Sequence, residues 1–128
     1  LFLIKKYKIN NRYILGHSDI APERKKDPGE KFPWKNLAKK NIGIWHSEKK
    51  NRLIKLRKKM LDNNENIRFV KNLKKIGYQS KKILLKEEKK FKKLLISAFQ
   101  RRFRPELVNG ISDKECLLIS QNLIKIQF

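Results

Sequence analysis

Apolar residues recur every three or four positions through the second half of the chain, which is the spacing of an amphipathic helix. The pattern predicts helices over residues 67–76, 86–103 and 112–126. At the start of the last one, SDKE matches a capping box, with Ser112 accepting from the amide of residue 115 and Glu115 reaching back. Short connections between amphipathic helices indicate a compact helical unit. Its expected core residues are Phe69, Leu73, Leu94, Ile96, Phe99, Leu118 and Leu123.

The first half of the chain has a less regular pattern. Residues 1–8 are expected to form the last turns of a helix, and residues 12–16 a short β-like run. A short helix led by Pro33 is expected to end at Asn41 and Gly43. The first piece of the chain is therefore expected to end near residue 46.

A lysine-rich helix is predicted over residues 47–62, with Ser47 as its N-cap. Its apolar face would carry Leu53, Leu56 and Met60. We favour a solvated connector over a polyanion-binding helix, because runs of charge usually face water. The polar stretch at 62–66 is then a predicted boundary.

Charge changes this picture only in part. The 128 residues include 34 Lys and Arg against 12 Asp and Glu, a formal net charge of +22. Such a charge attracts polyanions such as nucleic acid, an anionic wall polymer or a membrane surface. Lysine, isoleucine and asparagine are all abundant, however, which an AT-rich coding sequence would also produce. The lone Cys116 allows no internal disulfide and, among apolar neighbours, is expected to be a buried thiol.

No run of apolar residues approaches the roughly 20 that span a bilayer, and the N-terminal apolar run is too short for a signal peptide. The chain starts at Leu1, and its only methionine is Met60. We therefore expect the beginning of the protein to be missing from this sequence.

Residues 16–34, GHSDIAPERKKDPGEKFPW, combine ligand-type side chains with prolines and glycines that break regular structure. We expect a shaped loop. A catalytic zinc site takes three ligands from His, Asp, Glu and Cys, and His17 and Asp27 could supply two. On spacing alone the alternative is stronger: a histidine near a carboxylate is common in loops, and Asp19 could simply cap a turn.

The same run, continuing through LAKKNIGIW, resembles the C-terminal active-site loop of zinc-dependent N-acetylmuramoyl-L-alanine amidases. The resemblance covers residues 14–45 and implies that His17 and Asp27 are two of three Zn²⁺ ligands. It implies that Lys25 stabilises the oxyanion of the tetrahedral intermediate. Arg24 is substrate-facing or merely solvated, with equal weight, and Glu23 departs from the small residue common in the family.

In that family the first zinc ligand and a glutamate general base lie upstream of anything present here. His46 is expected to be an exposed residue after the end of the domain and not the missing ligand. Two ligands hold zinc poorly, so we expect this chain alone to be inactive.

A second, less specific resemblance covers residues 67–124, which are similar to the three-helix peptidoglycan-binding domain that follows some amidase domains. Phe99 and Phe103 are expected to be core residues, being four apart on a helix. The polar residues of the matching motifs are the candidates for contact with a glycan or stem peptide: Gln100, Arg101, Arg104 and Asn109.

Together these resemblances imply an α+β protein: the C-terminal fragment of an α/β amidase domain (1–46), a connector (47–64) and a small three-helix peptidoglycan-binding-like domain (65–128), so that this chain is mostly α. The implied reaction is zinc-dependent hydrolysis of the N-acetylmuramoyl-L-alanine bond of peptidoglycan or muropeptides, in the bacterial cell envelope or, alternatively, the cytoplasm. The chief alternative is a non-catalytic peptidoglycan-binding remnant. A basic nucleic-acid-binding protein is the weaker alternative, because no nucleic-acid-binding motif accompanies the charge.

Overall fold

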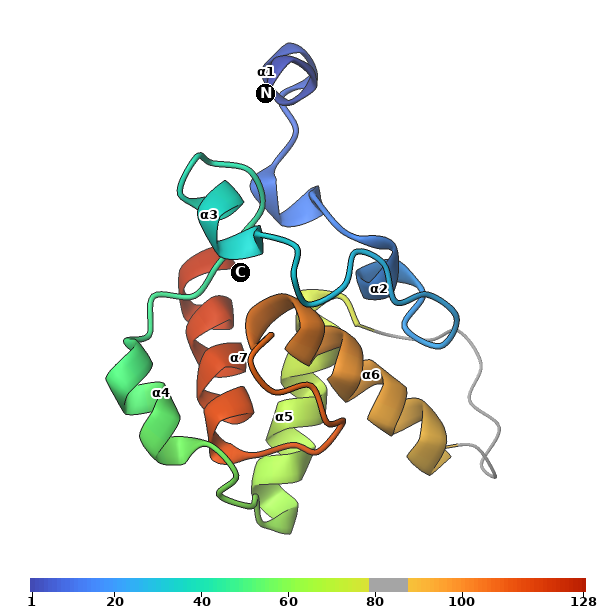
Figure 1. Ribbon diagram of the computed structural model, residues 1–128, viewed down its shortest axis with the longest axis vertical. Coiled ribbons are helices and arrows are strands. Elements are labelled where there is room, and N and C mark those ends of the chain that lie inside the picture. The colour runs from blue at the N-terminus through green and yellow to red at the C-terminus, as the bar shows by residue number, and fades with distance from the viewer. Residues whose placement is uncertain (79–87) are drawn as a thin grey trace.

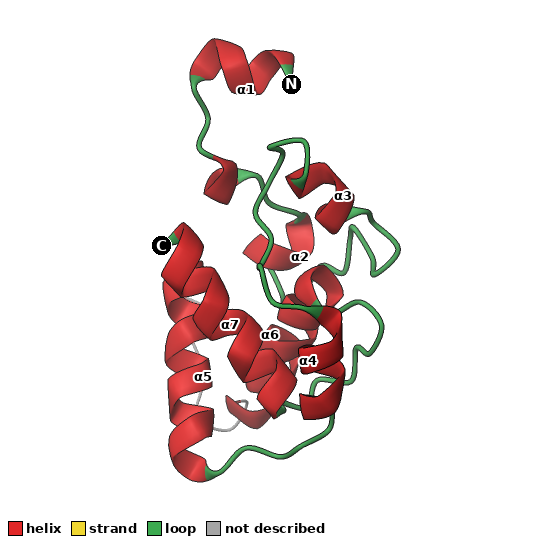
Figure 2. Cartoon of the chain, turned by 90° about the vertical axis from the view of Figure 1, so that its left-hand side faces the viewer, coloured by secondary structure: helices red, strands yellow, loops and turns green. Residues whose placement is uncertain are grey.

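The computed structural model describes residues 1–78 and 88–128. Within these ranges the elements, in chain order, are α1 (Phe2–Tyr7), a 3-10 helix (Asn11–Tyr13), α2 (His17–Ile20), α3 (Trp34–Ala38), α4 (Lys50–Leu56), α5 (Asn63–Ile76), α6 (Glu88–Phe103) and α7 (Lys114–Gln127). Figure 1 shows α4 to α7 gathered in one half of the molecule, with α1 at the opposite end of the long axis. Figure 2, from the side, shows the same separation.

The predicted α+β class is wrong for the described residues, which form helices and no strand (Figure 2). The expected β-like run at 12–16 begins instead as a 3-10 turn, because the Asn10 side chain accepts a hydrogen bond from the Arg12 amide at 3.1 Å. Ile14, which follows the 3-10 turn, has an extended backbone, but its carbonyl accepts from the Arg102 guanidinium at 3.0 Å. The Ile14 carbonyl is therefore bonded to a side chain, whereas in a sheet it would accept from the backbone of a neighbouring strand.

Helices α5 and α7 pack side by side, and their ends are set by aspartate caps (Figure 1). Asp62 and Glu65 form a capping box: Asp62 accepts from the Glu65 amide at 2.8 Å, and Glu65 accepts from the Asp62 amide at 3.1 Å. The predicted box at Ser112 is wrong. Asp113 caps α7 by accepting from the Cys116 amide at 2.9 Å, while the Ser112 hydroxyl bonds to Asn66 at 2.8 Å.

The predicted helix over 47–62 is also shorter than expected, since α4 covers only Lys50–Leu56. Ser47 does not cap it: its amide donates to the Asn122 side chain at 2.8 Å, which ties it to α7. Beyond the helix, Lys58 adopts a left-handed φ of 64°. Leu53 is buried as expected, but Met60 is 66% exposed. The predictions for the start of α6 at residues 86 and 87 lie outside the described residues.

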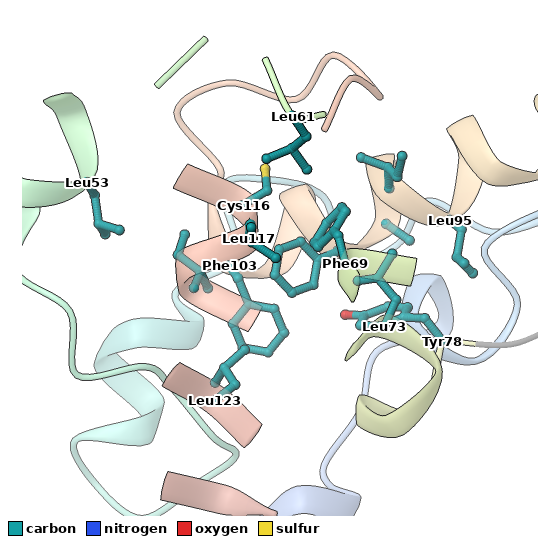
Figure 3. Close-up of a cluster of buried hydrophobic side chains, with 14 of the residues drawn as sticks. Leu53, Leu61, Phe69, Leu73, Tyr78, Leu95, Phe103, Cys116, Leu117 and Leu123 are labelled. Atoms are coloured by element: carbon teal, nitrogen blue, oxygen red, sulfur yellow. The ribbon is translucent and has the colours of Figure 1, made fainter. Parts of the chain in front are cut away.

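The core lies between α5, α6 and α7, with α4 at its edge (Figure 3). Six of the expected core residues are buried: Phe69, Leu73, Ile96, Phe99, Phe103 and Leu123. Leu94 and Leu118 are half-buried. Cys116 is fully buried, as expected, and burial raises the pKa of its thiol to about 12. The helical unit thus has a continuous apolar interior. Helix α6 also contacts α2 and α3 of the N-terminal part of the chain.

Candidate functional site

The histidine-bearing loop begins with one helical turn, α2, although the sequence predicted no regular structure there. Asp19 starts this turn by accepting from the Gly16 amide at 2.9 Å. Gly16 is required for close packing, because a Cβ atom there would lie 2.4 Å from Cδ of Pro28. The Ser18 amide donates to the Asp27 carbonyl at 2.9 Å, so the two ends of the loop lie side by side.

This folding brings His17 and Asp27 together across ten positions of sequence. Nδ1 of His17 lies 2.6 Å from Oδ2 of Asp27, and the two side chains are 70% and 63% exposed. The hydrogen bond with His17 is the main cause that lowers the pKa of Asp27 below its ordinary value. The carboxylate is therefore ionised at neutral pH, the form in which it binds a metal.

The donor set fits part of a zinc site. An imidazole nitrogen and a carboxylate oxygen are both ordinary zinc ligands, and here they are adjacent and open to solvent. Within residues 1–78 and 88–128, no group of three or more His, Cys, Asp or Glu side chains could hold a metal ion. The pair of His17 and Asp27 is therefore fewer than the three or four protein and solvent ligands that a zinc site uses.

The remaining histidine, His46, lies elsewhere, between α3 and α4. It stacks on Trp45 with ring centroids 5.0 Å apart, and its Nδ1 accepts from the Glu48 amide at 3.2 Å. It is half-buried, not exposed as the sequence suggested, and burial lowers its pKa to about 4.

Lys25 and Arg24 lie on the exposed outer turn of the loop. The backbone amides of both donate to the Ala21 carbonyl, at 2.9 and 3.0 Å, which fixes the turn that carries their side chains. The Lys25 ammonium contributes to the lowered pKa of Asp27, although less than the His17 hydrogen bond does. Arg24 lies 3.9 Å from Glu23, an exposed pair that contributes little to stability.

Helix α6 lies next to α2 (Figure 1), and two adjacent arginines of α6 bond to the loop. Nε and Nη2 of Arg101 donate to the Ser18 hydroxyl at 3.1 and 2.9 Å. Arg102 forms a buried ion pair with Asp19, at 2.6 Å, and Asp19 also accepts from the Tyr78 hydroxyl. Burial, followed by the charge of Asp19, raises the pKa of Tyr78 well above 10, so the phenol stays a donor. The two residues that follow His17 in α2, Ser18 and Asp19, are therefore held in place by hydrogen bonds.

The sequence missed this support. The available signal was the pair of arginines on α6 in a chain whose basic residues are mostly lysine. Arginine is the residue suited to buried, multiply bonded ion pairs.

Gln100 and Asn109, which are predicted to meet a wall ligand, bond to each other. The Gln100 side chain is fully buried, and its oxygen accepts from the amides of Asn109 and Gly110, each at 2.9 Å. Its nitrogen donates to the Ile111 carbonyl at 2.9 Å. Gln100 therefore holds the loop after α6 in place, and Asn109 is half-buried at its turn. Ligand contact by these residues stays a prediction.

Arg104 is likewise buried, with a 1% exposed side chain. It pairs with Asp113 and lies 3.4 Å from Glu115, which Arg57 also approaches at 3.1 Å. Its Nε donates to the Leu107 carbonyl at 3.0 Å. Arg104 lies at the centre of an ion-pair cluster that joins the end of α6 to the start of α7. Its contact with a ligand stays a prediction.

Comparison with known proteins connects this helical unit and loop with one class of enzyme. No family model matches the chain. The chain is nevertheless homologous to part of N-acetylmuramoyl-L-alanine amidases, as the sequence resemblance predicted.

The particular relative among curated proteins is the N-acetylmuramoyl-L-alanine amidase AmiD of Escherichia coli (strain K12), 32% identical over 123 residues, or 96% of this chain and 44% of AmiD. A solved complex of E. coli AmiD with anhydro-N-acetylmuramic acid-L-Ala-D-gamma-Glu-L-Lys matches 98% of this chain and 48% of that chain, with a TM-score of 0.78 and 32% identity. The structure of AmpDh3 from Pseudomonas aeruginosa matches 98% of this chain and 50% of its own, with a TM-score of 0.73 and 27% identity. The chain thus spans about half the length of the relatives it matches.

Proposed function

We propose that this chain is part of a zinc-dependent N-acetylmuramoyl-L-alanine amidase that hydrolyses the amide between the lactyl group of muramic acid and L-alanine in peptidoglycan or muropeptides. The observation that carries the proposal is the exposed contact of 2.6 Å between His17 and Asp27. It lies in the region shared with AmiD, whose solved complex contains a muropeptide named as its substrate. AmpDh3 has also been solved with anhydromuramic pentapeptide.

In this proposal His17 and Asp27 hold Zn²⁺, which when bound supplies a Lewis acid for the scissile carbonyl and lowers the pKa of water. Asp27, whose pKa is lowered, binds the metal without first losing a proton at neutral pH. Lys25 holds its ammonium beside the loop, where it stabilises negative charge that develops on the carbonyl oxygen. Arg24, on the same turn, is available to the substrate.

We place this activity in the bacterial cell envelope, where peptidoglycan is turned over, with the cytoplasm as the alternative. The helical part at 65–128 is proposed to hold the wall polymer near the loop. Among the helices in the described part of the chain, none is long and apolar enough to cross a membrane.

Zinc binding to the chain is the first test of the proposal. Zn²⁺ is titrated against a competing chromophoric chelator, with wild type, His17→Ala, Asp27→Ala and, as a matched control, His46→Asn. We expect one equivalent of zinc to bind wild type and the control, and each loop variant to lose at least about tenfold in affinity, the effect typical of losing metal-site groups. Equal zinc binding by wild type and His17→Ala would contradict the assigned ligands.

A second candidate is a wall-binding protein without catalysis. It is favoured by the finding that residues 1–78 and 88–128 contain no complete group of three metal-binding side chains. The two candidates are separated by incubating the chain and purified muropeptide with Zn²⁺ and searching by mass spectrometry for a free peptide that starts with alanine. Release of that peptide, abolished by Asp27→Ala, supports the amidase. Muropeptide binding that is unchanged by Zn²⁺, by His17→Ala and by Asp27→Ala supports the second candidate.

A further inference from the structure

An open groove separates the histidine-bearing loop from α6. Its volume is about 560 Å³. One wall is formed by the loop, including Lys26 and Glu30, and the other by Lys93, Ser97 and Arg101 of α6. The loop and α6 are neighbours in Figure 1, where α2 lies over the helix. The groove is therefore formed jointly by the two parts of the chain.

The groove is lined by residues next to the candidate zinc ligands, although His17 and Asp27 do not line it themselves. Lys26 immediately precedes Asp27 in sequence. At the base, Arg101 donates to the hydroxyl of Ser18, which immediately follows His17. A molecule bound at His17 and Asp27 thus has the groove beside it.

The charge of the lining is predominantly positive. Lys26, Lys93 and Arg101 contribute three cations, against the single carboxylate of Glu30. Lys26 and Lys93 are exposed and come from opposite walls. The arrangement favours a ligand that carries more than one carboxylate, because each wall offers its own cation.

The rest of the lining suits short aliphatic groups and amides. Leu94, Pro105 and Val108 contribute apolar surface, and Ser97 and Asn109 contribute hydrogen-bonding groups. This lining lacks an aromatic side chain, the usual platform for a sugar ring. A peptide of alanine-sized residues with carboxylates matches it better than a glycan does.

The α6 side of the groove is fixed by the loop that follows the helix. Gly110 has a φ of 70°, and a Cβ there would lie 2.6 Å from Cγ of Lys93 and 2.8 Å from Oγ of Ser97. The fully buried Gln100 holds this turn through the amides of Asn109 and Gly110, each at 2.9 Å. The Lys93 stem is therefore backed directly by a hydrogen-bonded turn, so its position is restricted.

We propose that this groove binds the acidic stem peptide of the muropeptide, with Lys26 and Lys93 pairing with its carboxylates and Leu94 and Val108 contacting its small side chains. The proposal rests on the function proposed above, and it assigns peptide recognition to the contact between the loop and α6. Gln100 then acts as a positioning residue: it holds the turn that backs the groove and does not itself contact the peptide.

The test compares two double variants of the full chain that remove the same charge from exposed lysines. Lys26→Gln/Lys93→Gln alters the groove, and Lys74→Gln/Lys75→Gln alters a separate cavity of about 270 Å³ beside Tyr78. The Kd of a fluorescent anhydro-muropeptide is measured by anisotropy at matched ionic strength. We expect the groove variant to weaken binding about tenfold, equivalent to about 1.4 kcal/mol, and the control less than about twofold.

A second ligand, the same muropeptide with its peptide carboxylates amidated, should bind wild type about as weakly as the groove variant binds the acid form. Equal losses in the two double variants would overturn the proposal in favour of non-specific charge attraction, as would a greater loss in the control. Full binding of the sugar without its peptide would overturn it in favour of a glycan site. Peptide binding that depends on Lys26 and Lys93, together with equal zinc binding by wild type and His17→Ala, would support the groove and contradict the zinc site of the proposed amidase.

Discussion

His46 is held in its neutral form by its surroundings. Its Nδ1 accepts a hydrogen bond from the Glu48 amide at 3.2 Å, which a protonated nitrogen could not do. Burial, with the charge of Lys35 as a smaller cause, lowers its pKa from 6.5 to about 4. Protonation of His46 therefore destabilises the folded state.

The pH dependence of stability should report this group. Between pH 6.5 and about 4 the unfolded chain binds a proton at His46 that the folded chain does not. The unfolded state thus takes up more protons, and stability falls as pH falls through this window, by about 2 kcal/mol. Urea unfolding at a series of pH values measures the slope, and His46→Asn, which keeps an acceptor in place of Nδ1, should flatten it.

His17→Asn serves as the control, since it removes the other histidine and leaves His46 in place. The slope should persist in that variant. A slope unchanged in His46→Asn, or abolished in His17→Asn, would contradict the assignment of the proton to His46.

At the residue scale the sequence singled out His17 and Asp27 together but did not predict the burial of Gln100 and Arg104. His17 and Asp27 were singled out as a pair, and the loop does bring them within 2.6 Å. Gln100 and Arg104 were singled out for the same kind of reason, their polarity within a motif. A buried polar side chain and an exposed one look alike in sequence, and only the packing of α6 against its neighbours distinguishes them.

Helix α7 shows how a cap is chosen when two candidates are adjacent. Ser112 and Asp113 both have side chains that can cap a helix. Asp113 is selected because its other oxygen also accepts from the Lys58 amide at 3.1 Å and pairs with Arg104. The capping pattern in sequence contains no information on those distant partners, so it placed the cap one residue early.

Replacement of the cap should be far more damaging than replacement of its neighbour. Asp113→Ala removes the cap and leaves Arg104 buried beside Glu115 alone, and we expect a loss of about 3 to 5 kcal/mol in the free energy of unfolding. Ser112→Ala removes one hydrogen bond to Asn66 and should cost about 1 kcal/mol. Urea unfolding followed by circular dichroism compares the two. Comparable losses would indicate that Ser112 is the cap after all.

At the scale of the whole molecule, the sequence predicted the helical unit from periodicity but not the manner in which the first part joins it. The helices α5, α6 and α7 follow amphipathic patterns, which are local. The expected α+β class came from a resemblance and a short β-like run, and neither reveals that Arg102 donates to the Ile14 carbonyl. Contacts between residues more than 80 positions apart have no local signature.

Arg102 is the centre of that junction. Its guanidinium pairs with Asp19 at 2.6 Å, donates to the Ile14 carbonyl at 3.0 Å and lies 3.8 Å from the centroid of the Trp34 ring. Arg102 and Asp19 are both buried, at 2% and 7% exposure. Three segments of the N-terminal part therefore converge on a single side chain of α6.

Neutralising Asp19 should loosen the N-terminal part while the helical unit remains folded. Asp19→Asn leaves the Arg102 charge buried without a counterion, which typically costs about 3 to 5 kcal/mol. Because the apolar core lies among α4 to α7, we expect backbone amides in residues 16–28 to exchange faster with deuterium while those of α5 and α7 keep their protection. Hydrogen–deuterium exchange with mass spectrometry measures both regions in one experiment.

The double variant Asp19→Asn/Arg102→Met removes the stranded charge and keeps an apolar stem against Trp34, so it should recover part of the protection lost in Asp19→Asn. Zinc affinity should follow the same order, since His17 belongs to the turn that Asp19 starts. Faster exchange spread evenly over α5, α7 and residues 16–28 would show instead that the ion pair stabilises the whole chain as one cooperative unit. No recovery in the double variant would show that the Arg102 hydrogen bond to Ile14, and not the ion pair, holds the junction.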